Sequence, residues 1–420
     1  KVEDMDEIVK KLQSLYKRGF FHIFAGGICS KLVAFVSSIV IVRLVDKEAY
    51  AALAYADNIY SYVTLVAGLG MASAVLKYSM GENRDKNDSF YRFSMVYGTL
   101  FQVVLLVLIS IVVSKVDVPF KETSALLYSL LPYGFLYYWA LLLQSFFRTE
   151  LKNNRYAQFS FLQILLVFIL TVLGIKIAGV GAVPFARTIA LVLVIAVYGR
   201  PFFQRVWHAN LQRLEKSEIR GFMAMAISLL VSNIFSMIMP LNETFLVNNM
   251  IADEVATANY KVANLIPSQL PFVTSSIVIY FFPILAKEQD KKKVWDSAKQ
   301  VGRNIFLLIT FISLVGFIIT PFLIRFVYGS KYDDARVISG MLWIVYGLNA
   351  GMRMMPMNIL PAVGCVRYNV ILSMFSCIIH LVLDYIFIKN LGVYGAAFAT
   401  GIVYLVSGVL YWYYLFKITR

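Results

Sequence analysis

Charged side chains inside long apolar segments are the residues of this sequence best suited to chemistry. A charge placed at the middle of a membrane costs roughly 2.5–3.5 kcal/mol, so such a residue usually faces a charged partner or a water-filled cavity. The basic residues of this kind are Lys31, Arg187, Lys261 and Arg353, with Arg43 at the end of its segment. The acidic ones are Asp57, Glu243 and Asp384.

Two interpretations of these residues remain open. In the first they are structural ion pairs that hold helices together, for example Lys31 with Asp57 and Lys261 with Glu243. In the second the basic residues of both halves of the chain bind one anionic group. Phosphate and diphosphate suit Arg and Lys, because both residues donate charge-assisted hydrogen bonds. The excess of bases over acids favours the second, and leaves the three acids for ion or proton coupling.

Aromatic and imidazole side chains add further candidates. Tyr55, Tyr60 and Tyr137 could contact sugar rings, or they could be packing and membrane-interface residues. His22 and His380 lie in apolar segments and could relay protons, or they could be hydrogen-bonded packing residues.

Motifs for catalysis or cofactor binding are missing from the sequence. The three cysteines, Cys29, Cys365 and Cys377, lack the CxxC spacing of a zinc site or redox centre. No GxxxxGK[ST] motif for nucleotide phosphates occurs. We therefore expect no enzyme activity, no catalytic residue, no cofactor and no metal, and we expect transport energy to come from gradients.

The composition identifies the environment in which these residues must be positioned. The chain has 420 residues, of which 60% are hydrophobic and 15% charged, and its mean hydropathy is +0.71. Soluble domains carry about 25% charged residues, so these values exclude a cytosolic enzyme, a disordered chain and a disulfide-rich secreted protein. The net charge of +15 lies in short stretches between apolar runs, which is typical of a membrane protein rather than a nucleic-acid binder.

Twelve apolar runs are long enough to cross a bilayer as helices, which takes about 20 residues each. They are 19–42, 50–76, 93–113, 125–147, 157–175, 181–199, 222–247, 256–285, 305–327, 337–363, 369–388 and 391–416. The expected fold is an all-α polytopic membrane protein. Of the 39 Lys and Arg residues, 26 lie on the side of the N-terminus and 8 on the opposite side. The positive-inside rule then places both termini in the cytoplasm.

An internal repeat divides the twelve helices into two sets of six. Arg-Gly-Phe at 18–20 recurs at 220–222, Tyr55 corresponds to Tyr260, and Arg-Tyr at 155–156 recurs at 367–368. Gly179-Val-Gly-Ala recurs as Gly392-Val-Tyr-Gly-Ala. Two halves in the same orientation imply a pseudo-two-fold axis along the membrane normal and a substrate site between the halves.

The repeat also sets the expected domain boundaries. They are an amphipathic cytoplasmic segment at 1–18, an N-lobe at 19–199, a cytoplasmic linker at 200–221, a C-lobe at 222–416 and a cytoplasmic tail at 417–420.

Three stretches resemble the polysaccharide-transport branch of the MOP superfamily, the O-antigen flippases. The first runs from residue 20 to residue 78 and has Arg43 followed by Gly68-Leu-Gly-Met-Ala, although Leu44-Val45 replaces the usual Leu-Gly. The second is ETFLVNNMIADEVATANYKVANLIPSQLPFVTSSIVIYFFPILAKEQ, which has Tyr260, Ala263 and Pro283 at the family's usual positions and begins with Glu243, the acid that often precedes the leucine of this signature. The third is the final NLGVYGAAFATGIVYLVSG.

The resemblance implies both a fold and a function. It implies a V-shaped two-lobe transporter in the bacterial cytoplasmic (inner) membrane that flips an undecaprenyl-diphosphate-linked oligosaccharide, such as an O-antigen, capsule or exopolysaccharide repeat unit, to the outer leaflet. Relatives place cations on helices 1 and 8, where this chain has Lys31 and Lys261. The implied partners are the lipid-linked glycan and the bilayer, with a glycan polymerase and a chain-length regulator as candidates. No nucleic acid is expected, and the chain is expected to act as a monomer.

Two other functions compete with this one. A cation-coupled multidrug exporter of the same superfamily would need an acid in the N-lobe, typically on helix 1, which here carries Lys31 and no acid. A membrane glycan polymerase or ligase would need a large extracytoplasmic loop, and the predicted outer loops are short.

Overall fold

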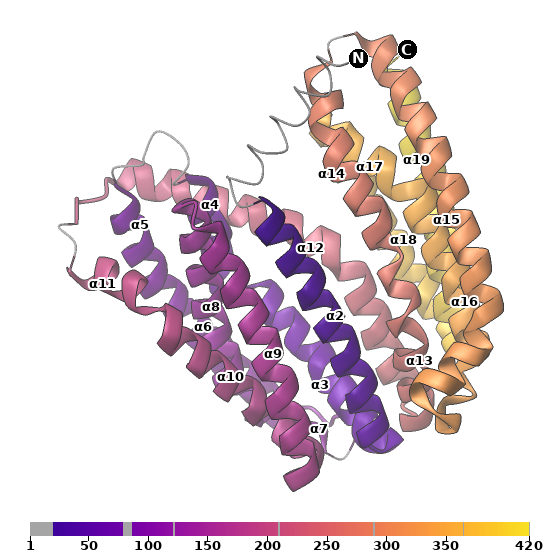
Figure 1. Cartoon of the computed structure of the whole chain (residues 1–420), viewed down its shortest axis with the longest axis horizontal. Coiled ribbons are helices and arrows are strands. Elements are labelled where there is room, and N and C mark those ends of the chain that lie inside the picture. The colour runs from indigo at the N-terminus through magenta and orange to yellow at the C-terminus, as the bar shows by residue number, and fades with distance from the viewer. Residues whose placement is uncertain are drawn as a thin grey trace. The chain divides into compact units, whose positions relative to one another are not determined.

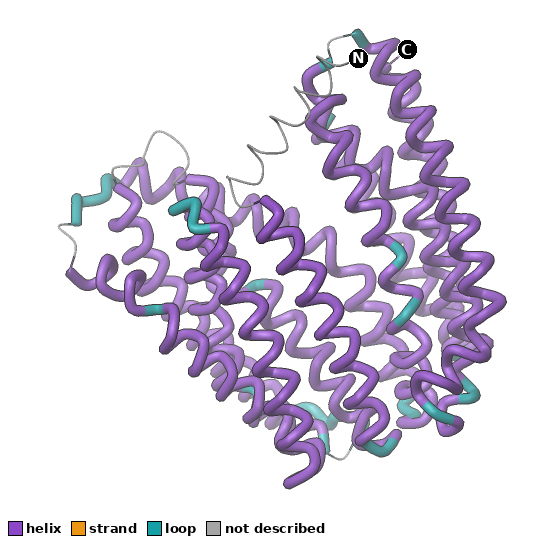
Figure 2. The backbone as a smooth tube through the Cα atoms, in the orientation of Figure 1, coloured by secondary structure: helices purple, strands orange, loops and turns teal. Residues whose placement is uncertain are grey.

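The computed structural model describes residues 20–78, 86–120, 122–208, 211–288, 290–363 and 365–419. All regular structure in these ranges is helical, and the helices are joined by short loops (Figure 2). The chain is therefore an all-α protein, as predicted. The predicted amphipathic segment at 1–18 lies outside the described residues, as does Arg420 of the predicted tail.

Contacts between Cα atoms group the chain into two compact units. The first contains the residues up to Val45 together with Ile59–Ile234, and the second contains Asp46–Asn58 together with Phe235–Arg420. These bounds differ from the predicted lobes: the break after Val45 lies in a loop, and the breaks after Asn58 and Ile234 lie inside α3 and α12. The predicted linker at 200–221 contains a helix of its own and the first turn of another. The lobe boundaries at 199 and 222 stay a prediction.

The first unit is a set of helices drawn mainly in indigo to magenta (Figure 1). In chain order its elements are α2 (Phe20–Leu44), the end of α3 (Lys47–Leu65), η1 (Ala67–Gly70), α4 (Met71–Tyr78), α5 (Asn87–Phe93), η3 (Ser94–Gly98), α6 (Thr99–Lys115), α7 (Thr123–Ser129), α8 (Leu131–Thr149), α9 (Asn153–Ala178), η4 (Gly179–Ala182), α10 (Val183–Tyr198), α11 (Arg200–His208) and the first half of α12 (Lys216–Ile251). Its core centres on buried aromatic rings, among them Tyr138, Phe146 and Phe202.

The second unit begins with the first half of α3 and resumes in the second half of α12. Its further elements are α13 (Glu254–Leu265), η5 (Pro267–Gln269), α14 (Pro271–Lys287), α15 (Lys291–Tyr328), η6 (Ser330–Tyr332), α16 (Ala335–Leu348), η7 (Asn349–Arg353), α17 (Met354–Ala362), α18 (Val366–Leu391) and α19 (Val393–Thr419). Its main core joins α14, α15, α17 and α19 through side chains such as Ile309, Leu360 and Tyr411.

Local sequence signals explain where these helices start and stop. The Asp290 carboxylate accepts hydrogen bonds from the backbone N–H groups of Lys292 and Lys293 and so caps α15. Helices α9 and α18 each have 26 residues and end at a glycine with positive φ, +68° at Gly179 and +58° at Gly392. The two glycines occupy matching places in the sequence repeat, so the repeat is expressed in the backbone of each unit.

Each of the twelve apolar runs lies in helical structure in the described ranges. Seven helices there are long and apolar enough to cross a membrane, or eight when α7 and α8, bent by 43°, count as one span. The longest of these stretches, Asn153–Tyr198, has 46 residues. It joins α9, η4 and α10 and covers two of the predicted runs. The chain is a multi-pass membrane protein, and the count of twelve spans stays a prediction.

Candidate functional site

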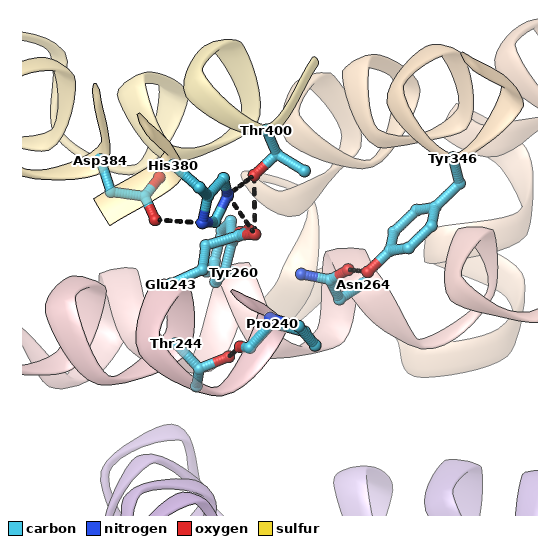
Figure 3. A network of polar contacts seen from close by, with 9 residues as sticks. All are labelled: Pro240, Glu243, Thr244, Tyr260, Asn264, Tyr346, His380, Asp384 and Thr400. Carbon is cyan, nitrogen blue, oxygen red and sulfur yellow. Dashed lines mark hydrogen bonds and ion pairs between the residues drawn. The ribbon is translucent and has the colours of Figure 1, made fainter. Parts of the chain in front are cut away.

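Glu243 is a buried carboxylate in the second half of α12, one turn after Pro240. A proline inside a helix removes a backbone donor, and the Thr244 hydroxyl donates to the Pro240 carbonyl at 3.0 Å (Figure 3). Glu243 is only 7% exposed. It accepts one hydrogen bond from the Tyr260 hydroxyl and another from Thr400 Oγ1 at 2.7 Å. Three helices, α12, α13 and α19, therefore meet at this carboxylate.

His380 and Asp384 extend the same group from α18. Four residues apart, they share one face of the helix, and the two side chains are 1% and 0% exposed. His380 Nδ1 lies 3.0 Å from Asp384 Oδ2, while Nε2 lies 2.9 Å from Thr400 Oγ1 and 3.7 Å from Glu243 Oε2. Figure 3 shows these side chains converging. We call Glu243, Tyr260, His380, Asp384 and Thr400 the acid–histidine network.

The acid–histidine network has two hydrogen-bonding arrangements that differ in where its protons lie. The Thr400 hydroxyl has one hydrogen, which it can donate to Glu243 or to His380 Nε2. If it donates to Glu243, it accepts from Nε2–H, and the neutral imidazole has no proton on Nδ1, which lies 3.0 Å from Asp384 Oδ2 without a hydrogen bond. If Glu243 is protonated instead, Thr400 donates to Nε2 and the imidazole proton lies on Nδ1. The two arrangements differ by one proton, which the network can bind and release.

Arg353 is a buried cation at the end of η7, the π-helical turn between α16 and α17. Its side chain is 9% exposed, and Nη1 donates to Asn349 Oδ1 at 3.2 Å. The guanidinium lies 5.3 Å from the ring centroid of Tyr404 and 5.8 Å from that of Tyr411. Cation–π contacts partly stabilise such a charge, and the buried Nε–H stays without a hydrogen-bond acceptor in the described residues.

Helix α19 joins Arg353 to the acid–histidine network. Thr400 and Tyr404 are four residues apart and lie on the same helix face. Thr400 contacts Glu243 and His380, and Tyr404 covers the guanidinium. A buried cation and a network that can bind a proton are therefore neighbours in the second unit.

The remaining predicted residues are distributed over both units. Lys31 and Arg43 are exposed on α2, and Arg187 is half-buried on α10, all in the first unit. Asp57 on α3 and Lys261 on α13 are half-buried in the second unit. Each of these five side chains has interaction partners in the structure. Their part in substrate binding or coupling stays a prediction.

The three predicted sugar-contacting tyrosines are buried or half-buried. Tyr55 is 4% exposed and donates to Asn249 Oδ1 at 3.0 Å, and Tyr60 is 3% exposed and packs against Gly134. Tyr137 is half-buried, with its ring centroid 5.8 Å from that of Tyr133. Sugar contact by these rings stays a prediction.

Sequence patterns do not assign several residues of the site. Tyr260 is marked only by the repeat and the family resemblance, and no pattern marks Thr400 or Tyr404. A signal for the network was present: His380 and Asp384 have the i, i+4 spacing that places two ionisable groups on one helix face. The convergence of Glu243, from 137 positions earlier in the chain, leaves no such signal, because it depends on tertiary packing.

The chain resembles solved transporter structures along almost its whole length. A structure of the inward-facing conformation of a multidrug resistance MATE family transporter of the MOP superfamily matches with a TM-score of 0.71 and 16% identity, over 93% of this chain and 94% of the other. A MOP superfamily transporter from Pyrococcus furiosus matches with a TM-score of 0.64 and 14% identity, over 96% and 94%. A mutant of the Vibrio cholerae MATE transporter VcmN matches with a TM-score of 0.66 and 14% identity, over 97% of each chain. No match to a curated protein is found.

The chain therefore has the fold of these MOP superfamily transporters and several helices long and apolar enough to cross a membrane. The sequence profile of the family described as "Polysaccharide biosynthesis protein" matches residues 16–289. The chain belongs to this family, the polysaccharide-transport branch of the superfamily, as its sequence resemblance predicted.

Proposed function

We propose that this protein is a flippase that moves an undecaprenyl-diphosphate-linked oligosaccharide from the inner to the outer leaflet of a bacterial cytoplasmic membrane by alternating access. Membership of a polysaccharide biosynthesis family supports a glycan cargo. The observation that supports a lipid-linked diphosphate as the cargo is the buried cation Arg353, which is 9% exposed. In the described residues its Nε has no hydrogen-bond partner, its Nη1 donates to an amide oxygen, and no anionic side chain pairs with it. A buried charge of this kind is costly unless a partner neutralises it.

The basic residues are the proposed contacts of the diphosphate. Arg353 would hold one phosphate by a charge-assisted hydrogen bond. The other proposed contacts are Lys31, Arg43, Arg187 and Lys261. The glycan would contact Tyr55, Tyr60 and Tyr137, while the polyprenyl tail stays in lipid. We further propose that the protein acts as a monomer, with both termini in the cytoplasm, and supplies a glycan polymerase and its chain-length regulator.

The acid–histidine network is the proposed coupling site. Its two hydrogen-bonding arrangements differ by one proton, and the residues that form it come from α12, α13, α18 and α19. A proton gradient could therefore act on the packing of these helices. Asp57, the third predicted acid, is a candidate for the same role from α3.

A complementation assay tests the proposal. In a strain that lacks the protein and accumulates lipid-linked glycan, we expect the Arg353→Ala variant to lose at least about tenfold in surface-glycan export and Arg353→Lys to recover part of it. Arg325→Ala, on the exposed end of α15, is the matched control and should export normally. Normal export by Arg353→Ala and by Lys31→Ala, at normal expression, would contradict a cationic site.

The alternative is a cation-coupled multidrug exporter, which the structural likeness to MATE transporters favours. Against it, α2 carries Lys31 and no acid over Phe20–Leu44. Export of cationic dyes from cells that express the protein, with no change in surface glycan on its deletion, would favour this alternative instead.

A further inference from the structure

Helix α15, drawn in orange in Figure 1, is longer than a membrane is thick. Its 38 residues span about 57 Å at 1.5 Å per residue, whereas a bilayer with its headgroups is about 40–45 Å thick. The apolar run at 305–327 alone spans about 34 Å, which is enough for the hydrocarbon core. The first turns of the helix, residues 291–304, therefore extend beyond the hydrocarbon core.

These first turns carry basic side chains along one helix face. Lys299 and Arg303 follow Lys292 by seven and eleven positions, spacings that return to the same side of a helix with 3.6 residues per turn. All three side chains are exposed, and within the described residues none of them forms an ion pair. Asp296 shares this face, so three positive charges and one negative charge leave a net charge of +2. We call Lys292, Lys299 and Arg303 the basic stripe.

Further along α15 the same face is apolar and exposed. Leu307, Leu314 and Phe317 lie four, eleven and fourteen positions after Arg303, and their side chains are 60%, 56% and 45% exposed. Exposed apolar side chains in the apolar run of a membrane-crossing helix contact lipid. The opposite face of the helix, which includes Gly302, is buried. The basic stripe is therefore in line with the lipid-facing side chains and lies above lipid rather than above the interior of the unit.

The aromatic end of α19 marks the level of the lipid headgroups on α15. Trp412 packs against Gly302, so closely that a Cβ built on the glycine would lie 2.4 Å from the Trp412 ring. The next residue, Tyr413, is 56% exposed, and Trp and Tyr favour the headgroup region of a membrane. Arg303, which follows Gly302, therefore lies at the headgroup level. Lys299 lies one turn, about 6 Å, farther from the hydrocarbon core.

Lys292 belongs to the same stripe but lies too far out to reach the headgroups. It is about 16 Å beyond Arg303 along the helix axis, whereas the headgroup layer on each side of a bilayer is about 5–8 Å thick. The long side chain of a lysine bridges only part of that distance. The stripe therefore has two residues that can contact lipid phosphate and one that cannot.

We propose that Lys299 and Arg303 bind the phosphate group of an anionic phospholipid on the lipid-facing surface of α15, at the end of the second unit where α19 finishes. Both residues donate charge-assisted hydrogen bonds to phosphate, and each basic residue near an anionic leaflet strengthens the attraction about fivefold. By the predicted topology this leaflet is the cytoplasmic one. The inference goes beyond the proposed function and does not depend on it, because the ligand is a component of the membrane and not the cargo.

Lipid titration of the purified protein tests this site. The protein is stripped of lipid in detergent and titrated with dioleoyl phosphatidylglycerol or with dioleoyl phosphatidylcholine, and native mass spectrometry counts the bound lipid. The site variant is Lys299→Gln with Arg303→Gln. Lys291→Gln with Lys292→Gln is the matched control, because it removes the same charge from the same helix. A third variant, Lys299→Arg with Arg303→Lys, keeps both charges.

We expect the unmodified chain to bind phosphatidylglycerol more tightly than phosphatidylcholine. The site variant should lose at least about tenfold in phosphatidylglycerol affinity, the matched control should change by less than about twofold, and the third variant should keep most of the affinity. Equal affinity of the unmodified chain for the two lipids would overturn the proposal, as would equal affinities of the site variant and the matched control. Thermal unfolding in detergent shows whether each variant is folded, and Lys299→Gln alone replaces the site variant if the double substitution unfolds the protein.

Discussion

At the scale of residues, the second unit combines a buried cation with a buried group of acids. The Arg353 guanidinium lies against aromatic rings and donates to an amide oxygen. The Glu243 carboxylate accepts hydrogen bonds from Thr400 and Tyr260, and the Asp384 carboxylate lies 3.0 Å from His380 Nδ1. Two buried carboxylates, one near each ring nitrogen of the same imidazole, cannot both be ionised at low cost while that imidazole is neutral. Burial of these two carboxylates therefore favours the binding of a proton by the network, whatever the substrate is.

The Thr400 hydroxyl can be tested alone, because it contacts both Glu243 and His380. We expect Thr400→Val to reduce export about tenfold or more and to destabilise the protein by about 1–3 kcal/mol, since a buried acceptor loses its donor. Thr400→Ser keeps the hydroxyl and should retain most of the export and most of the stability. Export assays and thermal unfolding in detergent measure the two effects. Equal export by the Val and Ser variants would show that the hydroxyl has no role in transport.

At the scale of elements, glycines determine how two helices end. Gly68 lies beneath the Tyr138 ring, and Gly179 ends α9 with no atom within 4 Å of a built Cβ. Both have positive φ, so both favour glycine for the backbone alone. Only Gly68 also has no room for a Cβ atom, because the Tyr138 ring occupies that place.

The comparison of Gly68→Ala with Gly179→Ala separates backbone strain from steric overlap. We expect Gly179→Ala to cost about 1–3 kcal/mol, the backbone contribution alone, because its φ of +68° and ψ of −159° are almost restricted to glycine. Gly68→Ala should cost several kcal/mol more, because the Tyr138 ring must move out of its buried place. Thermal unfolding of the two purified variants measures the difference. Equal costs would mean that the Tyr138 ring can shift freely.

The start of α12 is joined to the segment before α5 by an ion pair whose titration can be predicted. Lys86 Nζ lies 2.6 Å from Glu218 Oε1, and Glu218 Oε2 accepts from the Glu215 N–H at 2.8 Å. These hydrogen bonds lower the pKa of Glu218 below its ordinary value of 4.5, and the same pair raises the pKa of Lys86 above 10.5. The folded protein therefore holds the Glu218 charge more strongly than the unfolded chain does.

The sign of the pH effect follows from these two shifts. The contribution of Glu218 to stability is present above pH 4.5 and is lost as the pH falls through its lowered pKa. The contribution of Lys86 is present below pH 10.5 and is lost as the pH rises through its raised pKa. We expect Glu218→Gln to lower the melting temperature slightly at pH 7 and to lower it less at pH 3, where part of the contribution of Glu218 is already lost. High salt should reduce the difference. An equal loss at both pH values would contradict an ionic contribution.

At the scale of the whole molecule, the distribution of positive charge predicts the orientation in the membrane. With 26 Lys and Arg residues on the N-terminal side against 8 on the other, the N-terminal side should face the cytoplasm. We expect a reporter that is active only in the cytoplasm to be active when fused after residue 420 and inactive when inserted at residues 117–120. A reporter that is active only outside the cytoplasm should give the opposite result. Activity of one reporter at both positions would contradict the predicted topology.

By itself the sequence determined the environment, the helical class and the family, because apolar length and charge placement follow from lipid solvation rather than from tertiary contacts. It also identified Glu243, Asp384 and Arg353 as candidate functional residues, because an ionisable residue inside an apolar run can be recognised without knowledge of its neighbours in space. Only the tertiary structure decided which of these residues meet: the hydrogen bond between Thr400 and Glu243 joins positions 157 residues apart, and the division of α3 after Asn58 depends on the packing of its two halves. Periodicity reports the face of one helix, whereas these features depend on how several helices pack, which no local pattern encodes.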